Sequence, residues 1–115
     1  MSHISTDRDL VTLVNVFTVA PDRQQHLVDL LVAATREVMN RLPGFISANI
    51  HQSLDGTRVV NYAQWRTTGD FEAMLANPAA REHMRAAAAI ATSIEPHLYR
   101  VVHVDEVAAI PPRPL

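Results

Sequence analysis

Two hydrogen-bonding side chains, Asn61 and Trp65, stand among apolar residues in the stretch 59–65, VVNYAQW. Because the side chains of a strand alternate between its two faces, Asn61, Ala63 and Trp65 are expected to face the same way. An amide and an indole N–H are costly to bury without partners. A ligand that meets these groups removes that cost, so we expect this strand to form one wall of a ligand pocket.

The register of the hairpin around Asp55-Gly56 decides whether His51 also faces this pocket. If these two residues alone form the turn, His51 points away from Asn61. If Leu54 joins them in a type I turn with a glycine bulge, His51 and Asn49 lie on the face of Asn61. Both turns tolerate Asp-Gly, so the residues themselves leave the register open.

Composition excludes several classes of protein. The chain has 115 residues, enough for one domain with a single core. Ten basic and twelve acidic residues give a net charge of −2, so no nucleic-acid partner is expected. There is no apolar run long enough for a membrane span, and residues 1–9 lack the apolar stretch of a signal peptide. With no cysteine, no disulfide or thiolate nucleophile is possible, and we predict a cytoplasmic protein.

Hydrophobic periodicity predicts an α+β domain. Asp22 and Gln25 resemble a capping box ahead of an apolar helical stripe, whereas residues 10–19 are rich in β-branched types. The expected elements, in order, are a strand at 10–19, a helix at 22–42, strands at 45–53 and 57–66, helices at 67–76 and 79–92, and a strand at 98–107. This order is the ferredoxin-like split βαβ arrangement, in which helices cover one face of an antiparallel sheet. The domain is expected at 10–107, between an N-terminal arm at 1–9 and a proline-rich tail at 108–115.

The sheet face without helices is expected to be apolar. The apolar residues expected on this face come from the last and the second strand: Leu98, Val102, Val104, Ile46, Ala48 and Ile50. Such a patch would be exposed on a monomer, so burial against a second copy in a two-fold homodimer is predicted. The tail is expected to lie over the partner subunit.

Three motifs together resemble the antibiotic biosynthesis monooxygenase family. They are Pro-Gly-Phe at 43–45, Asp-Gly-Thr at 55–57 and the stretch 59–65. The likeness covers nearly the whole chain and is greatest to the cofactor-independent enzymes that convert anthrone-like phenols of aromatic polyketides to quinones. It implies a dimeric α+β barrel, a small aromatic substrate, O₂ as the oxidant, and no cofactor or metal.

The resemblance also implies roles for four residues. Asn61 and Trp65 match the pocket donors of the family and suit a developing oxyanion. His51 matches its second-strand histidine and suits a general base. Arg85 matches an arginine of the third helix and could hold a phenolate or carboxylate.

The remaining pocket residues are expected to bind the substrate: Phe45, Asn49, Phe71 and Met74. Phe71 departs from the family pattern, because the polyketide enzymes carry a tyrosine there that is thought to transfer protons. A phenyl ring can line the pocket but can neither donate nor accept a proton. The quinone-forming mechanism needs His51 near Asn61, and only the glycine bulge brings these two residues to the same face. We therefore predict a glycine bulge in the hairpin.

Each of these residues also has a purely structural interpretation. Trp65 could be core, His51 a partly exposed strand residue and Arg85 a solvated helix residue. Asn61 is harder to explain in this way, because asparagine is depleted in strands. The other histidines, at positions 26, 83, 97 and 103, lack the spacing of metal ligands and are expected at the surface or an interface.

Three rival functions remain open on the sequence. Haem degradation could use Asn15 and His83, but Met74 stands where those enzymes carry a helix tryptophan. A polyketide cyclase would need the same apolar pocket without O₂. A non-catalytic dimer that binds a small molecule is compatible with Phe71.

Overall fold

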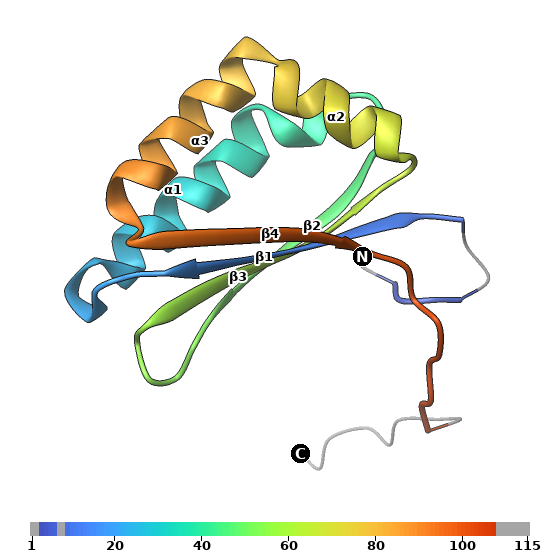
Figure 1. Ribbon diagram of the computed structural model, residues 1–115, viewed down its shortest axis with the longest axis horizontal. Coiled ribbons are helices and arrows are strands. Elements are labelled where there is room, and N and C mark those ends of the chain that lie inside the picture. Colours follow the sequence, from blue (N-terminus) through green and yellow to red (C-terminus); the bar gives the residue numbers. More distant parts are fainter. Residues whose placement is uncertain (1–2, 7–8, 108–115) are drawn as a thin grey trace, which may run out of the picture.

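The computed structural model describes residues 3–6 and 9–107, and Figure 1 shows them as one sheet with its helices on one side. Its elements, in order, are β1 (Val11–Thr18), α1 (Gln24–Glu37), β2 (Phe45–Gln52), β3 (Arg58–Trp65), α2 (Thr68–Ala76), α3 (Pro78–Ile90) and β4 (Ser93–Tyr99). The predicted ferredoxin-like arrangement is confirmed. The predicted tail at 108–115 lies outside the described residues.

The sheet is antiparallel with the strand order β2-β3-β1-β4. The two central strands, β1 and β3, each pair on both edges. Within residues 3–6 and 9–107, the helices α1, α2 and α3 pack on one face of this sheet, and no helix of this part covers the opposite face (Figure 1). Across the described residues, each helix is too short or too polar to cross a lipid bilayer.

The core lies between the sheet and the helices in two clusters. One contains Trp65, Phe71 and Met74, and the other contains Leu27 and Val59. These side chains alternate along the strands and recur at helical spacing along α1 and α2, as the sequence pattern predicts.

Two helix starts are fixed by side-chain caps. Asp70 N donates to Thr67 Oγ1 at 3.0 Å ahead of α2, and Ala80 N donates to Asn77 Oδ1 at 3.0 Å ahead of α3. Both caps satisfy backbone donors that the helix leaves unpaired. The predicted capping box at Asp22 is wrong, because a 3₁₀ turn at Pro21–Arg23 precedes α1 and no side chain caps it.

The last strand lies earlier in the chain than expected. β4 covers Ser93–Tyr99 instead of residues 98–107, and it contains Pro96. Proline is tolerated there because β4 is an edge strand that pairs only with β1. Leu98 pairs with Leu13, whose side chain is in the core, so Leu98 faces the helices instead of the open face.

The hairpin between β2 and β3 closes through a loop of four residues between Ser53 and Arg58. Ser53 N donates to Arg58 O at 2.9 Å, and Gly56 N donates to Ser53 O at 3.1 Å. Gly56 has a φ of +80°, in the left-handed region that favours glycine. The predicted glycine bulge is wrong: His51 pairs with Val60, the register of the other alternative.

The carboxylate of Asp55 organises this loop. It accepts hydrogen bonds from Thr57 Oγ1 at 2.7 Å, Ser53 Oγ at 2.8 Å and Thr57 N at 3.0 Å. These bonds, with the Thr57 hydroxyl first and the Ser53 hydroxyl next, lower the pKa of Asp55 from 3.8 to about 2. The side chains around Asp-Gly, more than the dipeptide itself, therefore hold the register.

Candidate functional site

Two asparagines face each other in the middle of the sheet. Asn15 of β1 and Asn61 of β3 are paired directly across the two central strands. Within the described part of the chain, the Oδ1 atom of each is buried and has no hydrogen-bond partner. A buried acceptor without a partner costs about 1–3 kcal/mol. Two of them side by side indicate a place where a ligand with hydrogen-bond donors binds.

Asn61 lies in the wall of a cavity between the sheet and the helices. The cavity has a volume of about 80 Å³, and its walls are almost entirely apolar. They consist of Leu13, Phe17, Leu31, Thr35, Met39, Phe45, Ala48, Asn61, Ala63, Trp65, Met74 and Met84. A cavity therefore lies between the helices and the sheet, where the sequence predicts the pocket, and Asn61 and Trp65 line it.

A second cavity of about 110 Å³ continues this space toward α3. It shares four walls with the first: Phe17, Leu31, Met39 and Met84. Methionine is unbranched and flexible, so Met39 and Met84 can move to join the two spaces. A planar ring system could then extend from one cavity into the other.

Trp65 is held rigidly beside Asn61. Its side chain is only 2 % exposed, and its ring meets Phe45 edge-on, with centroids 5.5 Å apart and planes at 85°. The Phe71 ring packs against Trp65 from another side, with ring centroids 6.4 Å apart and ring planes at 70°. Phe45 and Met74 line the cavity as predicted, whereas Phe71 supports Trp65 in the core and is not part of the cavity wall.

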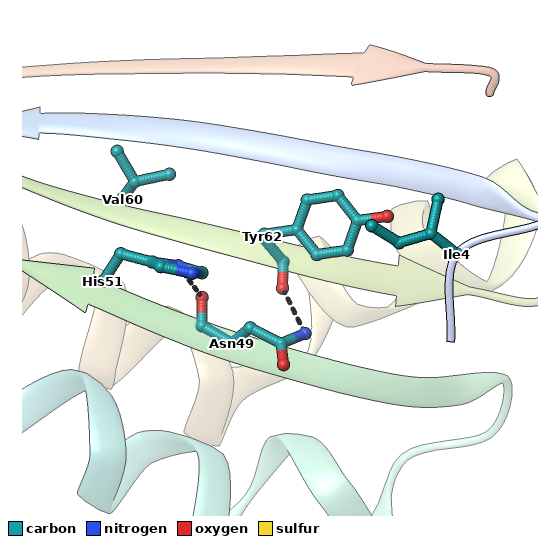
Figure 2. Close-up of a pocket in the computed structure, with 5 residues that line it drawn as sticks. All are labelled: Ile4, Asn49, His51, Val60 and Tyr62. Carbon is teal, nitrogen blue, oxygen red and sulfur yellow. Dashed lines mark hydrogen bonds between the residues drawn. The ribbon is translucent and has the colours of Figure 1, made fainter. Parts of the chain in front are cut away.

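His51 and Asn49 lie on the opposite face of the sheet (Figure 2). His51 is exposed, with Nδ1 3.2 Å from Asn49 O, and Asn49 Nδ2 donates to Tyr62 O at 3.0 Å. The predicted placement of both residues beside Asn61 is therefore wrong. Its physical reason is the four-residue loop, because a shift of one residue moves every side chain of a strand to the other face.

These two residues instead line a broad hollow of the open face, together with Ile4, Val60 and Tyr62. Its volume is about 480 Å³, and it is widely open to solvent. The Tyr62 hydroxyl is buried beside it without a hydrogen-bond partner among the described residues.

Arg85 does not reach the cavity. Its side chain is 73 % exposed on the outer face of α3, with Nη1 3.7 Å from Glu82 Oε2. The predicted catalytic role beside Asn61 is therefore wrong in its geometry. The helical period of α3 turns Ala80, Met84 and Ala87 inward and leaves Arg85 in solvent.

His83 lines the second cavity, although the sequence analysis placed it at the surface or an interface. Its side chain is 26 % exposed, and its Nε2 lies 3.8 Å from Glu37 Oε2 at the end of α1. The sequence did carry a signal, because His83 stands three residues after Ala80 and four before Ala87, which are both buried. The sequence gives Asn15 a role only in haem degradation, whereas the structure pairs it with Asn61.

Among the described residues, no group of three or more potential ligands is arranged to hold a metal ion. The cavity walls offer hydrogen bonds, one imidazole and much apolar surface. This combination suits an aromatic ligand with hydroxyl or carbonyl substituents.

Comparison with known proteins gives consistent matches. Residues 10–86, which include Asn61, Trp65 and His83, match the family model described as antibiotic biosynthesis monooxygenase. The tetracenomycin-F1 monooxygenase of Streptomyces glaucescens is 53 % identical over 83 residues, covering 72 % of this chain and 74 % of that protein.

Two solved structures extend the comparison. The monooxygenase from the gene ActVA-Orf6 of Streptomyces coelicolor, in complex with nanaomycin D, has a TM-score of 0.78 and 27 % identity, covering 90 % of this chain and 96 % of that one. SnoaB of Streptomyces nogalater, a cofactor-independent oxygenase, has a TM-score of 0.69 and 28 % identity, covering 84 % and 96 %.

Proposed function

The chain belongs to the antibiotic biosynthesis monooxygenase family, and we propose that it oxidises an anthrone- or hydroquinone-like aromatic to a quinone with O₂ and without a cofactor. The observation that carries this proposal is the pair of partnerless amide oxygens, Asn15 and Asn61, beside an apolar cavity walled by Trp65. Such a cavity fits a flat phenolic ring whose hydroxyl groups complete the hydrogen bonds that the protein leaves open. The likeness to a tetracenomycin-F1 monooxygenase and to a monooxygenase in complex with nanaomycin D supports this substrate class.

The reaction uses the electron density of the substrate itself. Loss of a proton from an anthrone C–H or a hydroquinone O–H leaves an electron-rich anion. The anion of an anthrone passes one electron to O₂, the two radicals combine to a peroxide on the former C–H carbon, and loss of water leaves the quinone carbonyl. The anion of a hydroquinone already carries both oxygens, so it passes two electrons to O₂, which leaves as hydrogen peroxide when the quinone forms. The indole N–H of Trp65 and the amide N–H groups of Asn61 stabilise the oxyanion, a contribution of about 2.7–4 kcal/mol for a single donor.

We also propose that two copies pair through the open face of the sheet. The last strand does not give the open face the apolar residue predicted for it, because Leu98 faces the helices. The support comes instead from the central strands, where Val14 pairs with Tyr62 and Val16 with Val60 on that face. A second copy would cover this band and the adjoining hollow. Light scattering is expected to give a dimer at micromolar concentration, and a monomer would contradict the proposal.

The decisive experiment follows product and oxygen together. The purified protein is offered a panel of anthrones and hydroquinones in buffer with a chelator, and quinone absorbance and O₂ uptake are recorded. We expect one O₂ consumed per quinone formed from an anthrone, unchanged by the chelator. If no compound of the panel is turned over, the protein is a non-catalytic binding protein. Product formation that persists without oxygen would indicate a cyclase.

Haem degradation is tested in the same preparation. Addition of hemin is expected to give no Soret band of a bound haem, because Trp65 lies on a strand and Met74 occupies the helix position. A cytoplasmic location and the tail over a partner subunit stay predictions.

A further inference from the structure

We propose that His83 is the catalytic base that removes the proton from the aromatic substrate. The inference rests on the proposed oxidation of a phenolic ring, because that reaction begins with proton loss. His51, the base expected from the sequence, faces away from the cavity. Among the described residues, His83 is the only titratable side chain that lines either cavity.

The position of His83 suits a group that accepts a proton and then returns it to water. The neighbouring Met84 lines both cavities, and Ala87, one turn later, is buried in the wall of the second. The imidazole therefore stands at the cavity wall while 26 % of its side chain remains exposed. A base that were fully enclosed would have no route by which to release the proton after each turnover.

Glu37 is the charged group that faces His83 from the packed helix α1. Its Oε2 lies 3.8 Å from His83 Nε2, and its own side chain is 67 % exposed. On α3, Glu82 and Arg85 pair with each other on the outer face. The other walls of the second cavity are apolar: Phe17, Leu31, Ala34, Met39, Met84, Ala87 and Ile94. At 3.8 Å the carboxylate lies beside the ring without a direct hydrogen bond to it.

The two cavities place the base and the oxyanion donors at different ends of one space. They share four walls, so a polycyclic substrate that extends across them meets His83 at one end and Asn61 at the other. In an anthrone the acidic C–H lies across the ring from the carbonyl oxygen. In a hydroquinone the two oxygens have the same relationship.

The proton transfer is balanced without any further reactant. In an anthrone the C–H bond at the His83 end breaks, and the proton moves to Nδ1, the ring nitrogen that does not face Glu37. The electron pair is delocalised as an enolate onto the carbonyl oxygen at the other end, which receives hydrogen bonds from Asn61 and Trp65. In a hydroquinone the O–H bond at the His83 end breaks, and the hydroxyl that remains at the other end donates to Asn61 Oδ1. Electrons then pass from this anion to O₂, and His83 releases its proton to water.

The test begins with His83→Gln, which keeps a good helix former and a polar group but cannot take up a proton near neutral pH. We expect kcat to fall by about 10²- to 10⁴-fold with a much smaller change in KM. The acid limb of the wild-type pH profile of kcat/KM should also disappear. His26→Gln is the matched control, because His26 is an exposed histidine of α1 outside the cavity walls, and it should keep wild-type turnover.

A second variant separates chemistry from structure. His83→Ala leaves space at the cavity wall, and added imidazole should restore turnover in proportion to its concentration; a structural role would not respond in this way. Turnover of His83→Gln close to the wild-type value overturns the inference. If neither variant folds, the wild type decides: kcat/KM that is flat between about pH 5 and 8 excludes a histidine base. If the wild-type protein oxidises no phenol, both the proposed function and this inference are refuted. If the wild type is active and His83→Gln keeps the same turnover, only the inference is refuted.

Discussion

Replacement of Asn61 by leucine should separate stability from catalysis. Leucine has nearly the shape of asparagine but brings no polar atoms. The Oδ1 atom of Asn61 is buried without a partner in the described residues, which costs about 1–3 kcal/mol. Removal of that acceptor is therefore expected to leave the free energy of unfolding unchanged or to raise it by up to about 3 kcal/mol. In a domain of this size, each kcal/mol corresponds to about 4–8 °C in Tm.

Catalysis should change in the opposite direction. Loss of one donor to the oxyanion removes about 2.7–4 kcal/mol of transition-state stabilisation, which is about 10²- to 10³-fold in kcat. Urea unfolding at one fixed protein concentration measures the first effect, since association also contributes to apparent stability. Initial rates of O₂ uptake with the best substrate of the panel measure the second.

Asn77→Ala is the matched control, because it also deletes one carboxamide. It removes the cap that accepts from Ala80 N at 3.0 Å, and Asn77 itself is not one of the residues that line the two cavities. We expect a loss of about 1 kcal/mol in stability and no change in kcat well below the melting temperature. The reasoning is refuted if Asn61→Leu loses stability while it keeps its turnover, since Asn61 would then be a structural residue.

Three further predictions test other parts of the structure. Trp65→Phe keeps an aromatic ring and removes the indole N–H, so kcat should fall about 10²-fold with a smaller effect on unfolding, and unchanged kcat would exclude the indole as a donor. Arg85→Ala should keep wild-type kcat and KM, because the side chain is exposed and paired with Glu82; a large fall would mean that Arg85 reaches the substrate. Gly44→Ala should lower the free energy of unfolding in urea by at least about 1–2 kcal/mol, because Gly44 has a φ of +81° and a Cβ there would collide with the Asp70 side chain; a neutral result would contradict this backbone geometry.

The sequence predicts the fold well where local signals and periodicity agree. The strand at 59–65, the helix that Thr67 caps and the break at Asn77-Pro78 are all observed. The fold, the family and the monooxygenase class that the resemblance implies are confirmed. The predicted position of the last strand is wrong because β4 runs through Pro96, and an edge strand accommodates proline.

The site was predicted only in the part that one strand determines. Asn61 and Trp65 share a face because side chains alternate along β3, and this follows from the sequence alone. The position of His51 depended on hairpin register, which the hydrogen bonds of Asp55 hold. Arg85 was placed by family resemblance, and the helical phase of α3, set by burial of Ala80 and Ala87, presents a different face to the cavity.

The sheet side of the site is rigid, whereas the helical side can adapt its shape. The asparagines and Trp65 stand on β1 and β3, which are hydrogen-bonded along both edges, so their backbone positions are fixed before the substrate arrives. Fixed dipoles stabilise a developing charge most strongly, because they need no reorganisation during the reaction. The helical side contributes Met39, Met74 and Met84, which can adjust to the outline of a ring system. An enzyme that draws its reactivity from the substrate needs both properties, because the oxyanion must be met in one geometry whereas the apolar rings need only be enclosed.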